Sequence, residues 1–283
     1  MFKIEDFLSL LRVKQWYKNT IIFIPLIFSL NLFNPKSFFL ILLGFVSLCL
    51  VSSSYYIIND VADFKKDKYH PEKKKRPIAS EKISRFEAIT ISIALFAISL
   101  TLASLLSVYF LYSVLALFVL SQLYNFYFRE IAFLDIIIIS INFVIRAVSG
   151  AFILNEKISY WVILLTFFIS VFLVSGKREL EVKIKDIKRY RSCFDESDID
   201  TLSALSSISI AVTIVFFSIY SILYQREGLL LSLPIALYIM ISYIHYKKIK
   251  PEEIRNPENF VFDKKILLSI LLWAIIVIIV LYH

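Results

Sequence analysis

Nine long apolar stretches dominate the pattern of hydrophobic and polar positions along the chain. Most are close to the roughly 20 residues that an α-helix needs to cross a bilayer, and the first is shorter. Their residues do not alternate with a period of two, which argues against a transmembrane β-barrel. The pattern therefore predicts an all-α polytopic membrane bundle of about nine transmembrane helices. The predicted spans are residues 18–34, 37–58, 86–106, 108–127, 133–153, 158–176, 201–224, 229–247 and 264–283.

Basic residues alternate in step with these spans. With the N-terminus inside, 27 of the 31 Lys and Arg residues fall in inner segments, and only Lys36, Lys157 and Arg226 fall in outer loops. Lys and Arg accumulate on the cytoplasmic side of membrane proteins. We therefore predict a multi-pass protein of the cell (inner) membrane whose N-terminus and charged loops are cytoplasmic.

Composition excludes several other classes of protein. The chain is 59% hydrophobic and carries a net charge of +8, but because this charge follows the membrane topology we predict no nucleic-acid partner. With only four glycines and no Walker or dinucleotide fingerprint, the chain offers no Gly-rich nucleotide loop. Cys49 and Cys193 suggest neither a disulfide framework nor a metal knuckle. The sequence leaves open whether the chain forms homo-oligomers.

A cluster of acids and cations follows the second span directly. Asn59, Asp63 and Asp67 are spaced i, i+4, i+8, and Asp60, Asp63 and Asp67 are spaced i, i+3, i+7. On a helix such residues share a face, so their side chains can converge. Hard oxygen ligands beside cations suit Mg²⁺ and a diphosphate. The alternative, a solvated acidic turn, is disfavoured because ionisable groups beside a membrane span are usually functional.

Polar residues elsewhere could reach the same site. The N-terminal stretch LRVKQWYKNT is either an interfacial segment or a contributor of Lys14, Lys18 and Asn19 to the cytoplasmic mouth, and both interpretations stay open. In the fifth span, Asp135 and Arg146 lie about three helical turns apart and can face one side. They would meet a polar cavity, which Tyr56 and Tyr124 could also line. For Arg146 a structural ion pair is the alternative to a substrate contact.

A second charged loop begins after the sixth span. Lys177 and Arg178 stand at the predicted membrane edge, with Glu181 and Asp186 beyond them. We predict that Lys177, Arg178 and Glu181 belong to the same site as the cluster after the second span. The chain is thus predicted to be one transmembrane domain, residues 1–283, with active-site loops at about 59–85 and 177–200.

Five motifs carry a resemblance to a known family. The motif NDVADFKKD (59–67) resembles the first aspartate-rich motif of the UbiA superfamily of intramembrane prenyltransferases. KQWYKN (14–19), HPEKKKRPIAS (70–80), RAVSGA (146–151) and SGKRELE (175–181) together resemble the polyprenyl-phosphate phosphoribosyltransferase branch. The likeness runs from about residue 12 to residue 181.

The resemblance implies a fold and an activity. Members are helical bundles with a central cavity open to the cytoplasm and sideways to lipid. The branch transfers a 5-phosphoribosyl group from phosphoribosyl diphosphate to a polyprenyl phosphate, with Mg²⁺, and releases diphosphate. By motif position, Asn59, Asp60, Asp63 and Asp67 would hold the metal, with the three aspartates catalytic. Lys73, Lys74 and Arg76 would contact phosphates.

Two departures from the family pattern bear on this prediction. Prenyltransferases carry a second DxxxD motif where this chain has Lys177-Arg178 and Glu181, which fits a donor with an additional 5-phosphate. The resemblance then implies that Lys177 and Arg178 bind the donor's phosphate groups and that Glu181 positions ribose hydroxyls or a metal-bound water. The glycine usual after the RPIAS stretch is Glu81 here. Two alternatives remain: a UbiA-type transferase that moves an isoprenoid chain from its diphosphate to a small aromatic or polar acceptor, and a transporter or flippase of a charged lipid.

Overall fold

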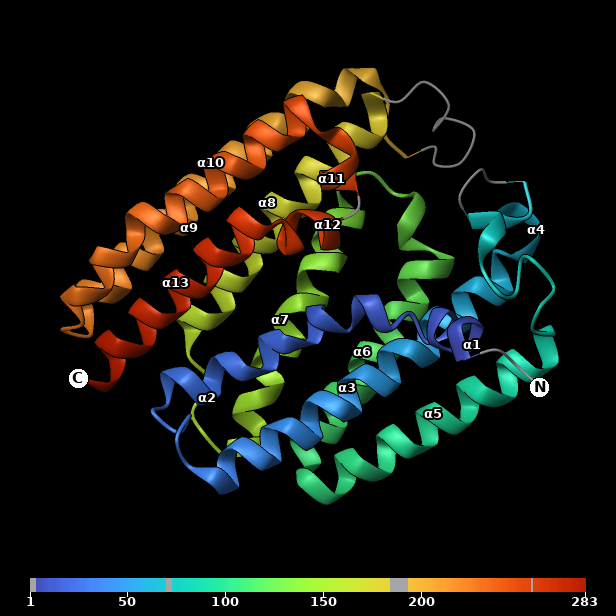
Figure 1. Cartoon of the computed structure of the whole chain (residues 1–283), viewed down its shortest axis with the longest axis horizontal. Helices are drawn as coiled ribbons and strands as arrows, with labels where there is room; N and C mark the ends of the chain where they lie inside the picture. The colour runs from blue at the N-terminus through green and yellow to red at the C-terminus, as the bar shows by residue number, and fades with distance from the viewer. Residues whose placement is uncertain (1–3, 70–72, 184–192, 256) are drawn as a thin grey trace. The chain divides into compact units, whose positions relative to one another are not determined.

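The structure, a computed structural model, describes residues 4–69, 73–183, 193–255 and 257–283 (Figure 1). Helices make up most of these residues, and no β-strand occurs among them, so the all-α prediction is confirmed. The helices are α1 (Ile4–Leu10), η1 (Val13–Phe23), α2 (Ile24–Phe28), α3 (Pro35–Ala62), α4 (Phe64–Asp67), η2 (Lys73–Lys75), α5 (Arg85–Leu106), α6 (Val108–Phe126), η3 (Phe128–Glu130), α7 (Leu134–Leu154), α8 (Tyr160–Lys183), η5 (Glu196–Asp198), α9 (Ile199–Leu223), η6 (Glu227–Ser232), α10 (Leu233–Ile249), α11 (Pro251–Arg255), α12 (Pro257–Phe262) and α13 (Lys264–Tyr282).

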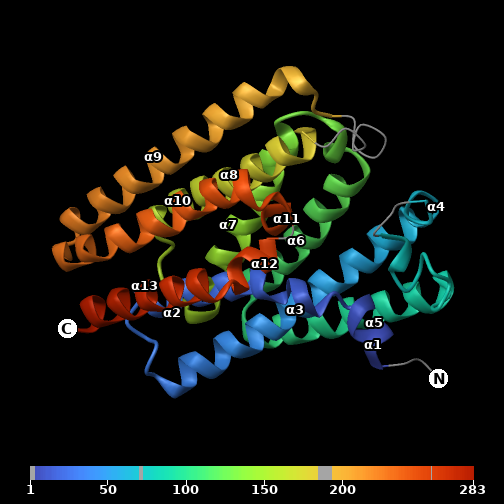
Figure 2. The ribbon, with the colours of Figure 1, turned by 45° about the horizontal axis from the view of Figure 1, so that its top comes forward.

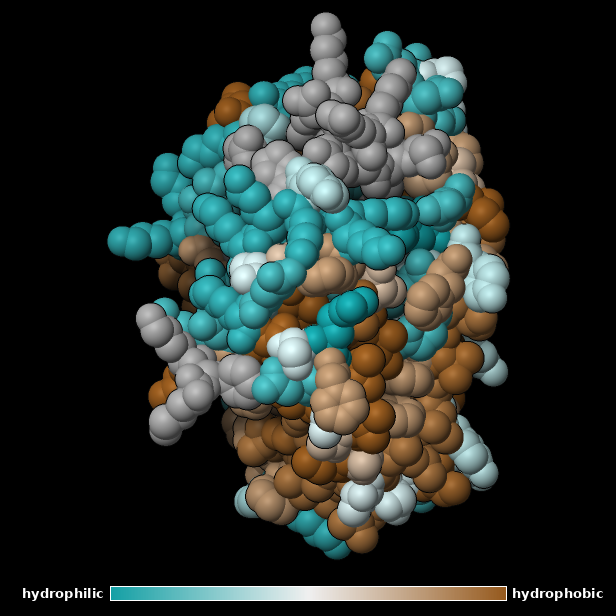
Figure 3. Space-filling view, turned by 90° about the vertical axis from the view of Figure 1, so that its right-hand side faces the viewer, coloured by the Kyte–Doolittle hydropathy of each residue, from teal (hydrophilic) through white to brown (hydrophobic). Residues whose placement is uncertain are grey.

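Eight helical segments in the described residues are long and apolar enough to cross a membrane. They correspond to the second to ninth predicted spans, and they contain α3, α5, α6, α7, α8, α9, α10 and α13. Many of their large apolar side chains are exposed, among them Leu105 at 78% and Leu268 at 68%. Figure 3 shows hydrophilic residues gathered on part of one face and hydrophobic residues over the rest. Such apolar exposure is expected of helices that face lipid.

The first predicted span, residues 18–34, does not form one long helix. The 11 residues of η1 are 3₁₀-helical, and the five of α2 follow them with Pro25 in the first turn. With a rise of about 2.0 Å per residue in η1 and about 1.5 Å in α2, residues 13–28 placed end to end extend about 30 Å. That length is close to the thickness of the hydrocarbon core. The segment is therefore long enough to cross a bilayer without being a regular α-helix.

The chain divides into two compact units. Unit 1 contains Met1–Phe126 and Ile145–Ile158, and unit 2 contains Tyr127–Val144 and Ser159–His283. Helix α7 contributes its first half to unit 2 and its second half to unit 1. The prediction that the chain is a single domain stays a prediction.

Paired serines join α3 to α5 in unit 1, where Figures 1 and 2 both show the two helices side by side. The Ser47 hydroxyl donates to the carbonyl of Ser99, and the Ser99 hydroxyl donates to the carbonyl of Ser47, at 3.0 and 2.8 Å. Two turns along, Ser54 and Ser92 pair at 2.9 Å. Small hydroxyl side chains let the helix backbones approach closely and satisfy each other within lipid.

Two glycines let other elements of unit 1 approach closely. A Cβ on Gly150 of α7 would lie 2.2 Å from the carbonyl oxygen of Ile22 in η1, and a Cβ on Gly44 of α3 would lie 2.3 Å from the Ile153 side chain. Any larger residue at either position would force the neighbouring element away. Gly150 therefore allows a close approach that brings η1 against the second half of α7.

In unit 2, α8 packs against α10 through a glycine and a tyrosine. A Cβ on Gly176 would lie 2.8 Å from the Tyr243 ring. The Tyr243 hydroxyl donates to the carbonyl of Leu173 at 2.8 Å, so its polar atom is satisfied within the apolar contact. This packing holds the charged end of α8, which carries Lys177, Arg178 and Glu181, against α10.

Candidate active site

A small apolar cluster in unit 1 anchors the segment that follows η2. Ile78 and Ile83 are buried and pack with Ile57 near the end of α3. The backbone N–H groups of Lys82 and Ile83 both donate to the carbonyl of Pro77, at 3.0 and 3.2 Å. Burial of these isoleucines holds the segment against α3. It thereby fixes the position of the Arg76 backbone, which directly precedes the segment.

The turn at Glu81 forms although the position lacks the glycine usual in the resembled family. Glu81 has φ 59, in the left-handed region that is unfavourable for residues other than glycine. Its backbone N–H donates to Ile78 at 3.0 Å, and its carboxylate pairs with Lys68. The hydrogen bond from Lys68 lowers the pKa of the Glu81 carboxyl. The substitution therefore leaves the turn intact.

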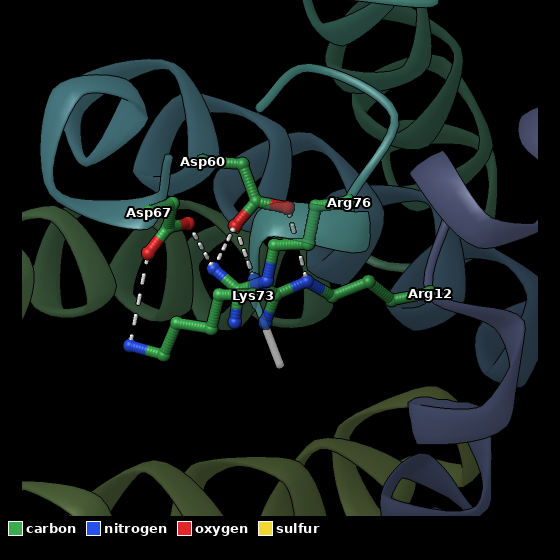
Figure 4. Close-up of polar contacts among 5 residues, drawn as sticks. All are labelled: Arg12, Asp60, Asp67, Lys73 and Arg76. Atoms are coloured by element: carbon green, nitrogen blue, oxygen red, sulfur yellow. Dashed lines mark hydrogen bonds and ion pairs between the residues drawn. The ribbon is translucent and has the colours of Figure 1, made fainter. Parts of the chain in front are cut away.

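Two aspartates and two cations of the predicted site meet at the end of α3 (Figure 4). Arg76 Nη1 lies 2.8 Å from Asp60 Oδ1 and 2.6 Å from Asp67 Oδ2, so one nitrogen bridges the two carboxylates. Lys73 Nζ lies 3.8 Å from the other oxygen of Asp67. Asp60 and Asp67 are 4% and 2% exposed. The sequence correctly predicted that these four residues cluster.

Arg12 is a member of this cluster that the sequence did not predict. Its guanidinium pairs with Asp60 and donates to both carboxylate oxygens. The Cζ atom of Arg12 lies 4.8 Å from the centroid of the Tyr56 ring. Arg12 lies 48 residues from Asp60 in the chain, which no helical spacing could reveal. The available signal was its position two residues before the KQWYKN motif.

The acidic residues do not lie on one continuous helix as the spacing predicted. α3 ends at Ala62, Asp63 is its C-cap residue, and α4 starts at Phe64. Among the described residues, no three His, Cys, Asp or Glu side chains are placed to hold a metal ion. The described residues therefore do not bring the three aspartates together as one metal-binding group, whereas Arg76 links Asp60 to Asp67.

Burial affects the pKa of two groups in this cluster, the Asp67 carboxyl and the Arg12 guanidinium. Burial raises the pKa of the Asp67 carboxyl above its usual value, and the charges of Arg76 and Lys73 offset part of that rise. For Arg12, burial lowers the guanidinium pKa, but the Asp60 charge and hydrogen bond outweigh it and the net shift is upward. The cluster therefore holds Arg12 firmly in its charged form.

The pair of carboxylates fits a magnesium ion that takes most of its ligands from elsewhere. Mg²⁺ is commonly held by one or two carboxylates and completes its shell with water and substrate phosphates. Asp60 and Asp67 already share one cationic nitrogen, so both can reach one cation. These two residues would hold the metal.

A second polar network lies within the apolar part of unit 1. Arg146 on α7, 5% exposed, donates from Nε to Asn19 Oδ1 at 3.0 Å and from Nη2 to the Tyr55 hydroxyl at 2.6 Å. Asn19 also donates to Cys49 Sγ at 3.4 Å. Asn19 and Arg146 were predicted site residues, and the structure joins them; Tyr55 was missed because tyrosines are abundant here.

Four other predicted residues of unit 1 lie on η1, η2 and α6. Lys14 is exposed on η1, and the ammonium of Lys18 lies 5.9 Å from the Tyr17 ring. Lys74 is exposed on η2, and Tyr124 is half-buried on α6.

In unit 2, Arg178 is held between two acids. Arg178 Nε lies 2.5 Å from Asp135 Oδ2 and its Nη2 lies 3.2 Å from Asp135 Oδ1, while Nη1 lies 2.5 Å from Glu181 Oε2. The Asp135 side chain is fully buried and that of Arg178 is 5% exposed. The second predicted group of site residues thus converges, but its arginine is already neutralised by carboxylates. Lys177 is half-buried beside it.

The contacts divide Asp135 from Arg146, which the sequence placed on one side of α7. Asp135 pairs with Arg178 of unit 2, whereas Arg146 binds Asn19 and Tyr55 of unit 1. The prediction that both face one cavity is therefore not reflected in their recorded partners. Helical spacing brought them to similar angles, but packing gave each a different neighbour.

Glu179 is a further buried charge that the sequence did not single out. It pairs with Lys183 at 2.7 Å and with Lys247 of α10 at 2.5 Å. Glu179 lies in the SGKRELE motif together with Arg178 and Glu181, so the motif was the available signal. Part of the second predicted loop, residues 184–192 with Asp186, and His70-Pro71 lie outside the described residues.

Comparison with known proteins identifies relatives along most of the chain. The model of the UbiA prenyltransferase family matches residues 20–271. Decaprenyl-phosphate phosphoribosyltransferases are 31% identical over 186 residues in Corynebacterium glutamicum and 31% over 193 residues in Mycolicibacterium smegmatis. These matches cover 64% and 67% of this chain, but only 56% and 60% of the relatives.

Solved structures agree on the fold. A UbiA homologue from Archaeoglobus fulgidus, solved with bound GPP and Mg²⁺, superposes with a TM-score of 0.72 at 17% identity, over 98% of this chain and 100% of the homologue. Digeranylgeranylglyceryl phosphate synthase superposes with a TM-score of 0.70 at 18% identity, over 100% and 99% of the two chains. Because the family model covers the aspartate cluster and seven of the eight long helices completely, the chain belongs to the UbiA prenyltransferase family.

Proposed function

We propose that this protein transfers the 5-phosphoribosyl group of phosphoribosyl diphosphate to a polyprenyl phosphate in the membrane. The observation that carries the proposal is the cluster at the end of α3, where Asp60 and Asp67 lie among Arg12, Lys73 and Arg76. Two carboxylates among three cations suit a metal-bound diphosphate better than a neutral substrate. The relatives named as decaprenyl-phosphate phosphoribosyltransferases support the choice of donor and acceptor.

The proposed reaction needs no strong base. An oxygen of the acceptor phosphate attacks C1 of the ribose, the bond between C1 and the diphosphate oxygen breaks, and its electron pair leaves with the diphosphate. The acceptor phosphate is already ionised near neutral pH, so its oxygen needs no further deprotonation. A Mg²⁺ ion at this site would stabilise charge that develops on the leaving diphosphate.

The chain's own residues would bind and orient the donor. Arg76 and Lys73 would donate to diphosphate oxygens, and Asp60 and Asp67 would hold the metal. Charge developing on the leaving group is stabilised best by donors that are fixed in advance. The anchored isoleucines beneath the loop, Ile78 and Ile83, supply that rigidity.

A prenyltransferase is the second candidate, because a structural neighbour was solved with bound GPP and Mg²⁺. Membranes that contain the protein should be incubated with radiolabelled phosphoribosyl diphosphate or an isoprenoid diphosphate, each with a range of acceptors. We expect label from the first donor to enter polyprenyl phosphate and mass spectrometry of the lipid to show the added phosphoribosyl group. Transfer only from the isoprenoid diphosphate would establish the alternative. The same assay distinguishes both enzymes from a transporter, which would move a lipid without forming a bond.

We also propose that Arg146 binds the phosphate of the acceptor lipid. Arg146 is 5% exposed, and its contacts with Asn19 Oδ1 and the Tyr55 hydroxyl hold its guanidinium within the apolar part of unit 1. A buried guanidinium in such surroundings suits a phosphate ligand, which it can contact through two N–H groups. The orientation proposed from Lys and Arg placement puts the charged end of α3 at the cytoplasm. The apolar chain of the acceptor would stay in the lipid while its phosphate enters the protein and reaches Arg146.

Arg146→Gln is expected to lower acceptor affinity by about 10–100-fold, the loss expected for a hydrogen bond to a charged group. Donor binding and melting temperature should stay close to those of the unchanged protein. Acceptor titrations and thermal melts in detergent measure the two quantities, and Lys36→Gln, at the other end of α3, serves as a charge-matched control. A lower melting temperature with unchanged acceptor affinity per folded molecule would instead identify Arg146 as a structural residue.

A further inference from the structure

Arg12 and Arg76 together occupy the oxygens through which Asp60 and Asp67 would hold a metal. Asp60 Oδ1 accepts from both arginines, and Asp67 Oδ2 accepts from Arg76 at 2.6 Å (Figure 4). A metal that binds these oxygens must replace guanidinium groups already in contact with them. The two arginines and a metal therefore compete for the same carboxylate oxygens.

The charge of the cluster disfavours a metal that arrives alone. Three cations, Arg12, Lys73 and Arg76, contact two carboxylates, Asp60 and Asp67. Even if the neighbouring Asp63 is added, the charges of these described residues sum to zero, so the cluster is neutral rather than acidic. A divalent ion would raise the local positive charge, whereas a diphosphate would lower it and would also give the displaced arginines new oxygen partners.

We propose that Arg12 is an exchangeable counter-ion of the aspartate pair, which moves from Asp60 to the diphosphate when a metal and a diphosphate bind together. Metal binding and diphosphate binding then depend on each other, since each relieves the charge imbalance that the other would create. This proposal rests on the proposed function only in requiring a donor with a diphosphate group, which both candidate enzymes use.

The surroundings of Arg12 suit a side chain that changes partners while its backbone stays fixed. On one side, the carbonyl of Leu11 accepts from the Ser53 hydroxyl at 2.7 Å; on the other, Trp16 Nε1 donates to the same hydroxyl at 3.1 Å. The main chain of Leu11 and the side chain of Trp16 are thus tied to α3 on either side of Arg12. The Tyr56 ring beneath the guanidinium offers a cation–π contact that does not depend on Asp60.

The test measures binding of Mn²⁺ alone and of pyrophosphate with and without Mn²⁺, using electron paramagnetic resonance and equilibrium dialysis on the purified full chain. Arg12→Gln should bind Mn²⁺ alone about tenfold more tightly and pyrophosphate with Mn²⁺ about tenfold more weakly, as loss of one charged contact predicts. In the unchanged protein, pyrophosphate binding should strengthen clearly when Mn²⁺ is added.

Weaker binding of Mn²⁺ alone by Arg12→Gln would overturn the proposal. If Arg12 only positions Asp60 for the metal, Arg12→Gln should bind Mn²⁺ more weakly, and unchanged Mn²⁺ affinity would also refute an exchangeable contact. Lys82→Gln is the matched control, because Lys82 pairs with Asp6 at 2.5 Å outside the cluster, and it should alter neither affinity. Should Arg12→Gln fail to fold by circular dichroism, Arg12→Lys keeps the charge without the two-pronged contact and should shift both affinities in the same directions by less.

Pyrophosphate keeps this test separate from the question of the donor. Synergistic binding of Mn²⁺ and pyrophosphate with no transfer from phosphoribosyl diphosphate would support the role of Arg12 and reject the proposed donor. Phosphoribosyl transfer with independent binding of Mn²⁺ and pyrophosphate would support the proposed donor and reject the role of Arg12.

Discussion

Replacing Asp60 or Asp67 with alanine is expected to lower turnover by at least about 10²–10³-fold, the loss typical of removing one key electrostatic group from an active site. Each variant removes one of the two carboxylates that share Arg76 and would hold the metal. Turnover is measured as phosphoribosyl transfer to polyprenyl phosphate, followed by mass spectrometry of the lipid. The fold should persist, because Arg12 and Arg76 remain partly exposed and water can solvate them when an acid is lost.

Three further variants make this prediction specific. Asp60→Asn keeps the shape of the side chain without its charge and should be nearly as inactive as Asp60→Ala. Asp63→Ala is expected to lose less turnover, because Asp63 caps α3 and is not grouped with the other two as a metal ligand. Asp6→Asn removes an acid outside the cluster and should stay active. Near-normal turnover of Asp60→Ala and Asp67→Ala at limiting Mg²⁺ would contradict the metal assignment.

Asp135→Ala is expected to lower the free energy of unfolding by about 3–5 kcal/mol, the usual result of breaking a buried ion pair by removing one partner. Asp135 is fully buried, and two of its oxygens accept from Arg178. Without it, a guanidinium that is 5% exposed loses the carboxylate that contacts two of its nitrogens. Thermal and chemical denaturation in a single detergent measure the loss.

A paired replacement separates stability from substrate binding. Asp135→Leu with Arg178→Leu removes both charges together and should recover much of the lost stability, because apolar residues often replace a buried ion pair without penalty. If Arg178 also binds the donor's phosphate, as its place in the SGKRELE motif predicts, the double variant should be stable yet show a raised donor KM. A double variant as unstable as Asp135→Ala would contradict the ion-pair explanation, and a stable one with an unchanged donor KM would show that Arg178 acts only through Asp135 and Glu181.

Local properties of the sequence were sufficient to predict much of this protein. Runs of apolar residues predicted all eight long helices, because length and hydropathy decide whether a segment can cross a bilayer. The NDxxDxxxD spacing and the basic cluster after it predicted that Asp60, Asp67, Lys73 and Arg76 would meet, since all lie within one short stretch of chain. The same motifs predicted the family that the comparisons confirm.

Tertiary structure decided which partners the isolated charges have. Arg12 reaches Asp60 across 48 residues, and Asp135 reaches Arg178 across 43, because helix packing closes those loops. Helical periodicity fixes the direction of a side chain around its own axis, but it carries no information on which helix lies opposite. That is why the spacing of Asp135 and Arg146 suggested one shared cavity, whereas packing paired the first with an arginine and the second with a neutral amide and a hydroxyl.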